Sequence, residues 1–314
     1  MPKLFKSLII VAFAMSLLAA CTSSPITPVE SETIVVTDVR GEVTIPLNPQ
    51  RIVDLSGNSD MLSILGYSVV GTANSDAYDY TKLPRYLENT LSGSKILGYA
   101  YQDTMDIEAI MNLNPDLIII STIQEKMVDM LSEIAPTVMI KMEALDWQAD
   151  LRTLGTLFQR TEQAETWLNT YASKAGNNGS ILRGLLGTET SYLSFLASGG
   201  QYYVFDGAGF GTVLYTDLGL ARPQGLPSQT DVSLPVVSME GLASIKADWF
   251  FVLGTDADNE ALMNNPLWMS LPAVKAERVL YLPASPYFTQ GYSAIGRELL
   301  LDEIVDLLSN EAGS

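Results

Sequence analysis

Short apolar runs and amphipathic stretches alternate along the chain from residue 33 onward. The run after Asp116, up to Ile120, has the length and composition of a strand buried in a parallel sheet. Stretches with apolar positions at helical spacing separate such runs, and Gly66 ends the first of them. The pattern predicts strands at 33–37, 43–45, 51–55, 68–71, 116–120 and 137–140, and helices at 60–65, 106–113 and 126–134. Strands that alternate with helices predict the α/β fold class.

A longer amphipathic stretch in the middle of the chain predicts one long helix over residues 161–185. Its apolar positions recur at helical spacing and form a single stripe, consisting of Ala164, Trp167, Leu168, Tyr171, Ala172 and Ala175. Glu162 and Glu165 lie in the first turn, where negative charge suits the helix dipole. Because glycine and asparagine are weak helix formers, Gly176–Gly179 (GNNG) predicts a kink or an end.

The second half of the chain shows the same alternation. Two apolar runs that are close in sequence, 191–196 and 202–205, predict an antiparallel pair of strands. A glycine-rich loop and a helix that ends at Gly219 follow them. Further strands are predicted at 249–253 and 279–282, and a closing helix at 296–308.

The second half also repeats a segment of the first. Asp106–Ile120 (DIEAIMNLNPDLIII) aligns without gaps on Ser238–Val252 (SMEGLASIKADWFFV), at a constant offset of 132 residues. Each copy contains a capping residue, a glutamate, a short amphipathic helix, an aspartate and a buried strand. Two similar α/β units on either side of one long helix predict two lobes. The predicted boundaries are 33–160 for the N-terminal lobe, 161–185 for the interdomain helix and 186–314 for the C-terminal lobe.

The first 32 residues have the layout of an export signal and a linker. Lys3 and Lys6 precede a 13-residue apolar stretch, Leu8–Ala20, which is shorter than the about 20 residues of a spanning helix. We therefore predict a signal peptide over residues 1–20 and a flexible tether over residues 21–32. Cys21 is the only cysteine, which excludes an intramolecular disulfide and a thiolate metal cluster.

Composition narrows the function classes further. The formal charge is −18, and loss of the two lysines of the signal peptide takes it to −20. Such a surface disfavours nucleic acid and anionic lipid as partners and favours a basic protein surface. The chain has no histidine, which removes the usual general base, the Ser–His–Asp arrangement and the commonest zinc ligand. An enzyme that uses carboxylates stays open on this composition, but we predict a protein without catalytic residues.

Three sets of residues are candidates for function. Glu108 and Glu240 hold the same position in the two copies, and the pattern alone fits either stabilisation of a helix start or a paired docking feature. The loop Asp206–Thr212 has the spacing G-x-G-x-G, which differs from the dinucleotide fingerprint. Aromatic residues gather in loops near strand ends, where α/β lobes bind ligands. The candidate ligand-contact residues are Tyr78, Tyr99, Tyr101, Thr122, Trp147, Tyr202, Phe210, Arg222, Tyr287 and Tyr292.

The two repeat copies, together with RIVDLSGNSDMLSILGYSVVGT, SEIAPTV and GAGFGTVLYTDLGL, resemble the periplasmic binding proteins for ferric siderophores, haem and vitamin B12. The resemblance covers nearly all of residues 33–309. It implies two α/β lobes joined by one long helix, with the ligand in a cleft that Phe210 faces. It also implies that Glu108 and Glu240 dock onto arginines of a membrane permease, and that an ATPase drives import. The regions around Trp147 and Tyr287 resemble the iron(III)-hydroxamate branch.

The N-terminal segment adds an anchor to this picture. Leu18–Cys21 resembles a bacterial lipobox, which implies cleavage before Cys21 and attachment of lipid to its thiol. We therefore expect a monomeric receptor, anchored by lipid at the outer face of the cytoplasmic membrane.

The ligand class follows from coordination chemistry and charge. A siderophore fills the coordination shell of its own iron, so the receptor needs no metal ligand and no cofactor. Few cations are available for an anionic tris-catecholate; the plausible ones are Lys82, Arg85, Lys141, Arg222 and Arg297. We therefore favour a ferric hydroxamate, with vitamin B12 and haem as alternatives within the family. A carboxylate-based surface hydrolase and an adhesin lipoprotein are the rivals from other classes.

Overall fold

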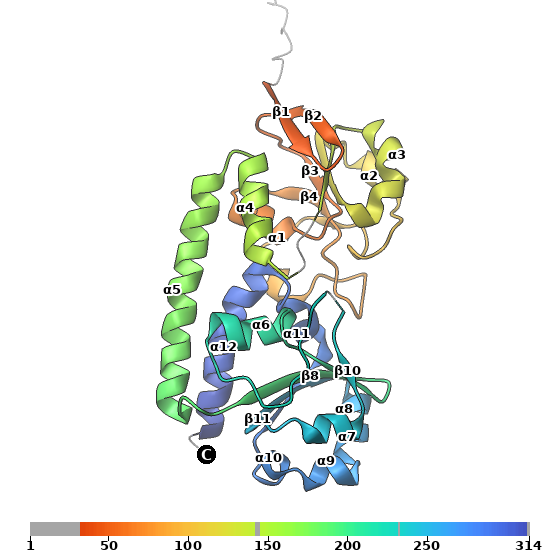
Figure 1. Ribbon diagram of the computed structural model, residues 1–314. Helices are drawn as coiled ribbons and strands as arrows, with labels where there is room; N and C mark the ends of the chain where they lie inside the picture. The colour runs from red at the N-terminus through yellow and green to blue at the C-terminus, as the bar shows by residue number, and fades with distance from the viewer. Residues whose placement is uncertain (1–31, 142–144, 232, 313–314) are drawn as a thin grey trace, which may run out of the picture. The chain divides into compact units, whose positions relative to one another are not determined.

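The computed structural model describes residues 32–141, 145–231 and 233–312. A hairpin and two five-stranded sheets make up its strands (Figure 1). The hairpin pairs β1 (Thr33–Asp38) with β2 (Gly41–Pro46) in antiparallel fashion, as the sequence predicts. The predicted signal peptide (residues 1–20) lies outside the described residues. The predicted tether (residues 21–32), which includes Cys21, also lies outside them except for Glu32.

The first sheet is wholly parallel. Its strands in spatial order are β5 (Lys95–Ile96), β4 (Val69–Thr72), β3 (Ile52–Asp54), β6 (Leu117–Ser121) and β7 (Thr137–Ile140). The second sheet has the order β10 (Val236–Val237), β9 (Gln201–Val204), β8 (Tyr192–Ser198), β11 (Trp249–Gly254) and β12 (Val279–Pro283). In this sheet β9 runs antiparallel to both of its neighbours, and β8, β11 and β12 are parallel.

Helices connect and cover the two sheets. Those of the first half are α1 (Ser59–Ile64), α2 (Ile107–Asn112), α3 (Val128–Ser132) and α4 (Trp147–Leu157), with 3₁₀ turns η1 (Arg85–Leu87) and η2 (Thr122–Met127). Those of the second half are α6 (Gly209–Thr212), the π turn η3 (Val213–Asp217), α7 (Met239–Ser244), α8 (Asp256–Met263), α9 (Pro266–Ser270), α10 (Pro272–Lys275), α11 (Ala284–Gln290) and α12 (Ala294–Ala312). The helix predicted at 126–134 is therefore shorter, because a 3₁₀ turn precedes it.

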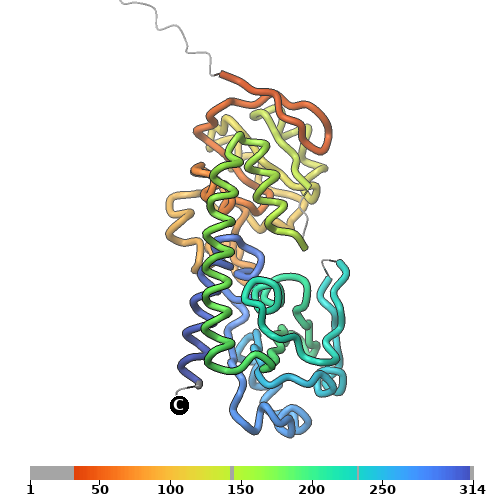
Figure 2. Tube along the Cα trace, turned by 60° about the vertical axis from the view of Figure 1, so that its left-hand side comes forward, coloured from red at the N-terminus to blue at the C-terminus, as the bar shows by residue number. Residues whose placement is uncertain are grey.

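One helix, α5 (Thr161–Leu186), runs beside both sheets and links the two halves of the chain (Figure 2). The prediction that it kinks or ends at Gly176–Gly179 is wrong, since it continues to Leu186. Glycine is required at position 179 because α5 packs closely against the backbone of Leu218. A Cβ atom at this position would collide with the Leu218 carbonyl oxygen. The stripe also differs from the prediction at Ala172, which is exposed, while Gly179 and Leu182 extend the buried face.

The hydrophobic core has three parts, and the alternation of side chains along the strands separates them. One cluster joins the inner faces of both sheets to α4, α5 and α12; Ile119 of β6 and Phe251 of β11 both belong to it. A second cluster, with Ile118 and Ile110, lies on the other face of the first sheet, beneath α2 and α3. A third, with Phe250, lies beneath α7 and α9 on the second sheet. Each sheet thus has a core of its own on one face, here called its private core, and both sheets share the first cluster on the other face.

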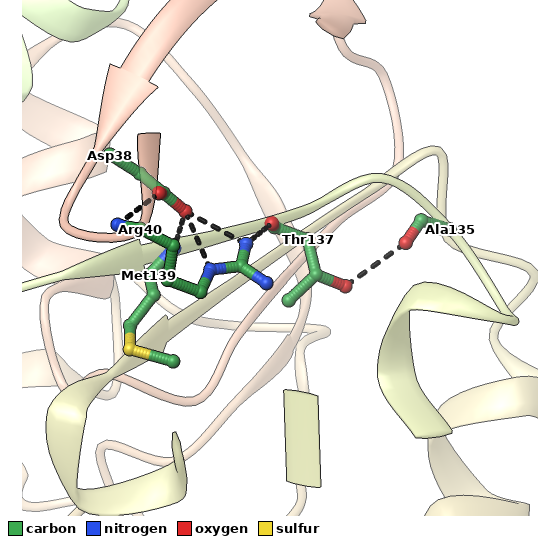
Figure 3. A network of polar contacts seen from close by, with 5 residues as sticks. All are labelled: Asp38, Arg40, Ala135, Thr137 and Met139. Atoms are coloured by element: carbon green, nitrogen blue, oxygen red, sulfur yellow. Dashed lines mark hydrogen bonds and ion pairs between the residues drawn. The ribbon is translucent and has the colours of Figure 1, made fainter. Parts of the chain in front are cut away.

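The hairpin covers the open edge of the first sheet at β7 (Figure 3). The Val39 amide donates to the Met139 carbonyl oxygen at 3.2 Å, and the Met139 amide donates to Asp38 Oδ2 at 2.9 Å. Arg40 binds the same carboxylate, with Nη2 2.8 Å from Oδ2, and also donates to the Thr137 carbonyl oxygen at 2.5 Å. Burial alone would raise the pKa of Asp38, but the hydrogen bonds from Met139 and Arg40 outweigh it and lower this pKa.

Candidate functional site

The repeat predicted from the sequence forms two equivalent units. In the first copy α2 leads into β6, and in the second α7 leads into β11. Asp106 and Ser238 cap the two helices: each side chain accepts a hydrogen bond from the backbone amide three residues on, at 3.0 and 3.1 Å. Both glutamates, Glu108 and Glu240, lie in the first turn and are exposed.

The aspartate of each copy has the same structural role. The Asp116 carboxylate accepts hydrogen bonds from the backbone amides of Gln50 and Arg51, at 2.7 and 2.9 Å. The Asp248 carboxylate accepts from the amide and the hydroxyl of Ser191, at 2.9 and 2.8 Å. Each aspartate therefore clamps the beginning of the neighbouring parallel strand, β3 or β8. The two clamps fix the α2–β6 and α7–β11 units on their sheets.

The two glutamates are available to a partner. Glu240 has its pKa lowered by a hydrogen bond from its own backbone amide and then by one from the Ser238 hydroxyl. It is therefore a carboxylate at neutral pH. Because both glutamates are exposed first-turn residues on helices over the private cores, they are presented outward and take no part in either core.

A cluster of aromatic rings, here called the aromatic cluster, draws on both halves of the chain. Phe288 of α11 is its centre, and its ring centroid lies 6.5 Å from Tyr78, 6.3 Å from Phe205 and 6.1 Å from Tyr292. Tyr78 comes from the loop after β4, in the first half, and the other three come from the second half. This arrangement puts aromatic surface from both lobes in one place.

Three further tyrosines extend the aromatic cluster within the first half. The Tyr80 and Tyr99 rings stack with 5.1 Å between centroids, and Tyr101 lies 5.4 Å from Tyr99. Tyr101 is 68% exposed, so this part of the cluster is open to solvent. Burial, and then the neighbouring Tyr101, raise the pKa of both Tyr99 and Tyr292, which indicates that these hydroxyls lie near each other. The hydroxyls of Tyr99, Tyr101 and Tyr292, whose pKa values are all raised, are neutral hydrogen-bonding groups at physiological pH.

Polar contacts hold the two halves together beside these rings. The Ser285 hydroxyl donates to the Asp76 carboxylate, which also accepts from the Tyr78 amide at 2.7 Å. The carboxylate of Asp60, in α1, accepts from Ser293 Oγ at 2.6 Å and from the amide of Ile295 at 3.3 Å. Asp60 thus caps the first turn of α12 from the other lobe. Its burial raises its pKa.

Several predicted ligand contacts do not lie in the aromatic cluster. Phe210 is wholly buried, with its ring 5.2 Å from Phe251, so in this structure it belongs to the core and the expectation that it faces a cleft is wrong. Tyr202 is also buried, in the private core of the second sheet, with its ring 5.8 Å from Phe195. The direction of Tyr202 follows from the alternation of side chains along β9, and that of Phe210 from the glycine turn that leads into α6.

Trp147 is likewise covered by its neighbours. It is 7% exposed and packs edge-on against Tyr171, with 4.9 Å between centroids, while the guanidinium of Arg297 lies 5.2 Å from its ring. Arg297 is itself buried and paired with Asp217 at 3.2 Å, so it is not a free cation for a ligand. Tyr171 completes this network by donating to Asp217 Oδ2 at 2.6 Å.

The remaining candidates are accessible to different degrees. Thr122 is exposed at the start of η2, directly after β6. Arg222 keeps 47% of its side chain exposed while it pairs with Asp206 at 2.5 Å. Tyr287 is half-buried beside Glu303 and Arg85, and burial and then the charge of Glu303 raise its pKa. Its neighbour Phe288, which is not among the predicted ligand contacts, is the centre of the aromatic cluster.

Two open depressions lie elsewhere, on the surface of the hairpin. Their volumes are about 390 and 520 Å³. The first is lined by Arg40, Gly41, Glu42, Val43, Thr44, Ser132, Pro136 and Thr137, and the second by Val35, Val36, Thr37, Arg152, Thr153, Thr156, Leu157 and Gln159. None of the predicted ligand contacts lines either one. The aromatic cluster is therefore the better candidate site.

The described residues contain no helix long and apolar enough to cross a membrane. Nor do they contain a group of three or more cysteine, aspartate or glutamate side chains arranged to hold a metal ion. Together, two sheets with their own helices, one long helix, paired surface glutamates and aromatic side chains drawn from both halves of the chain are the features expected of a binding protein with two α/β lobes.

Comparison with known proteins identifies the family. The chain belongs to the periplasmic binding protein family, whose model matches residues 59–286. It is 30% identical over 283 residues to the iron(3+)-hydroxamate-binding protein FhuD of Bacillus subtilis, an alignment that covers 85% of this chain and 84% of that protein. It is 28% identical over 304 residues to the probable siderophore-binding lipoprotein YfiY of the same organism, covering 88% and 89%.

A solved structure supports the fold. The FhuD fold-family protein BSU3320 of Bacillus subtilis, described as the periplasmic binding protein component of a Fep/Fec-like ferrichrome ABC transporter, superimposes with a TM-score of 0.71 at 25% identity. The match covers 86% of this chain and 97% of that chain. The α/β architecture expected from the sequence is thereby confirmed.

Proposed function

We propose that this protein is the receptor of an ABC importer and that it binds a ferric siderophore of the hydroxamate type. Family membership supports a substrate-binding role, and the relative FhuD is named for iron(III)-hydroxamate binding. The observation that carries the ligand class is the aromatic cluster, which offers rings and neutral hydroxyls from both lobes. Rigid aromatic surface binds a bulky ligand with little loss of side-chain entropy.

The charges near this cluster favour a neutral or weakly charged ligand. Three of the five cations that the sequence suggests are paired with acids: Lys82 with Asp79 at 2.7 Å, Arg222 with Asp206 and Arg297 with Asp217. A tris-catecholate complex of iron carries several negative charges and needs unpaired cations. A ferric hydroxamate does not. Vitamin B12 and haem have no observation in this structure that favours them.

The iron is cargo in this proposal and arrives already chelated. The protein therefore contributes surface contacts and hydrogen bonds, and no coordination bond, catalytic residue or cofactor is required. We further propose that Cys21 carries a lipid that anchors the protein outside the cytoplasmic membrane, as the Leu18–Cys21 motif implies and the lipoprotein relative supports.

Delivery is proposed to use the two exposed glutamates. Glu108 and Glu240 are one carboxylate on each lobe, each at the start of a helix that an aspartate clamp ties to its sheet. Arginines of a permease could bind each carboxylate through paired, charge-assisted hydrogen bonds. A pair of sites on two lobes would report the separation of the lobes, and hence the loaded state, to the membrane partner.

Titration of the purified protein with ferrioxamine B, followed by tryptophan fluorescence, tests the ligand class. We expect quenching with saturation for this hydroxamate and a much weaker response to a ferric tris-catecholate. Tyr99→Ala should weaken hydroxamate binding by about 10- to 100-fold, because it removes one half-buried ring of the aromatic cluster. Tyr203→Ala, at a half-buried tyrosine outside the aromatic cluster, is the matched control and should bind normally. Saturable binding of the catecholate alone would refute the proposed ligand class.

A further inference from the structure

The side-chain amide of Gln229 is buried without a partner. The residue is 9% exposed, and neither its Nε2 nor its Oε1 atom has a hydrogen-bond partner among the residues that the structure describes. A buried amide that lacks partners costs free energy, and such groups in native proteins usually meet water, an ion or a ligand. This amide therefore needs a functional explanation.

Its surroundings are built around one carboxylate. Asp206, 7% exposed, accepts a hydrogen bond from the Gln229 backbone amide at Oδ2, at 2.8 Å, and pairs through Oδ1 with Arg222 at 2.5 Å. One buried acid thus fixes the backbone of Gln229 and the guanidinium of Arg222. Tyr215 supports the guanidinium from another side, with its ring centroid 5.7 Å away. The side-chain amide itself is left free to pair with another group.

This polar group adjoins the aromatic cluster. Asp206 directly follows Phe205, whose ring is 6.3 Å from Phe288. Gly207 then packs against Gln229, since a Cβ atom at position 207 would lie 3.5 Å from the Gln229 carbonyl oxygen. The glycine loop next approaches Tyr292, which a Cβ atom at Gly209 would touch at 2.8 Å. A ligand on the cluster would therefore have Gln229 and Arg222 at its edge.

The atoms available define the chemical group that would fit. Gln229 offers one donor group and one acceptor, and Arg222 offers donors only. A carboxylate would leave Oε1 of Gln229 unpaired, because it has no proton to donate. A secondary amide supplies a carbonyl acceptor and an N–H donor side by side and satisfies both ends. We infer that Gln229, with Arg222 held by Asp206, binds a backbone amide group of the siderophore.

This inference rests on the proposed function, and its test separates the two. Ferrioxamine B, whose backbone contains amide groups, is titrated into the wild-type protein and into Gln229→Leu. Loss of the paired amide should weaken binding by about 5- to 100-fold. The same substitution should raise the melting temperature of the unliganded protein, because leucine replaces a polar group that has no partner.

Asn259→Leu is the matched control. Asn259 is also 9% exposed with an unpartnered oxygen, but it lies on α8 beside Gly254, in another part of the second lobe. Its replacement should leave the affinity unchanged within twofold. If Gln229→Leu does not fold, Gln229→Glu, which has the same shape but lacks the amide donor, is titrated in its place.

The outcomes are distinct. If the wild-type protein binds no ferric hydroxamate, the proposed function is wrong. If the wild-type protein binds and the Gln229 variant binds equally well, only the role of Gln229 is overturned. A fall in melting temperature with unchanged affinity would likewise assign Gln229 a purely structural role.

Discussion

The two copies of the repeat can be compared position by position, and they differ more in their sheets than in their helices. Each copy retains a helix cap, an exposed glutamate and an aspartate that clamps a neighbouring strand. The strand beside β3 is parallel, however, whereas the corresponding neighbour of β8 is antiparallel. The copies thus share the cap and glutamate of the exposed helix and the clamp at the start of one strand, while the pairing of that strand with its outer neighbour differs. This is the pattern expected if the shared surface meets a common partner.

The sheet edges differ as well. The outer edge of β7 is covered by the hairpin through Asp38, Val39 and Arg40. In the described part of the chain β12 pairs with β11 alone. An open edge strand can pair with another chain, so a cover at β7 protects the first sheet. The hairpin is thus an addition to the first lobe that the repeat does not explain.

The largest expected effect concerns the shared glutamates. Replacing both Glu108 and Glu240 with alanine should abolish ferric hydroxamate uptake by cells, because the carboxylates proposed to bind permease arginines are lost. Ligand affinity should stay within twofold, since both residues are exposed and outside the aromatic cluster. Uptake assays and fluorescence titrations measure the two properties separately, and each single variant shows whether the lobes contribute equally.

Glu125→Ala and Glu260→Ala are matched controls for this experiment, one on each lobe. Both are exposed helical acids outside the repeat motif, and uptake should persist in both variants. A loss of ligand affinity in the Glu108 or Glu240 variant would contradict the docking assignment and place that residue in the binding site.

A smaller effect should distinguish the two clamps. Asp116→Ala should lower the free energy of unfolding by about 1–3 kcal/mol, because two backbone amides lose a charged acceptor. Asp248→Ala should cost less, since one of its two partners is a hydroxyl and Asp248 is more exposed than Asp116. Urea unfolding measures both, with Glu260→Ala as the reference. Equal losses would show that the two clamps are energetically equivalent despite their different partners.

The smallest effect should depend on pH and belongs to the hairpin alone. The folded-state pKa of Asp38 is lowered from the ordinary value of 3.8, so its carboxylate stabilises the fold above pH 3.8 and loses this contribution as the pH falls through its folded pKa. Asp38→Asn should therefore cost about 1 kcal/mol at pH 7. The difference from the wild type should shrink below about pH 4. Urea unfolding at pH 7, 5, 4 and 3 checks this, and a difference that grows with acid would contradict it.

Much of the fold follows from local sequence patterns. The strands 116–120 and 137–140, the cap positions and the repeat register could be predicted because each depends on residues close together in the chain. The continuation of α5 through Gly179 could not, because it depends on contact with Leu218. Glycines that look like helix breakers can instead serve close packing.

The candidate site was harder to predict from the sequence, because it too depends on contacts between residues far apart in the chain. The sequence singles out aromatic residues near strand ends, but the directions of their rings depend on contacts that the sequence does not display. Phe210 and Phe288 are both aromatic residues in or beside glycine-containing loops, yet one is a core residue and the other is the centre of the aromatic cluster. The amide of Gln229 carries no sequence signal, since only burial reveals that it lacks a partner.

The contact between Asp60 and Ser293 has a consequence for how the chain is assembled. These residues are 233 positions apart, so the contact closes a very long loop. The first lobe emerges early during synthesis, but the helix that covers α1 is the last to arrive. We expect the early lobe to remain incomplete, and its apolar inner face uncovered, until the final helix docks. If the chain is exported as we propose, it would cross the membrane before this helix can complete the fold.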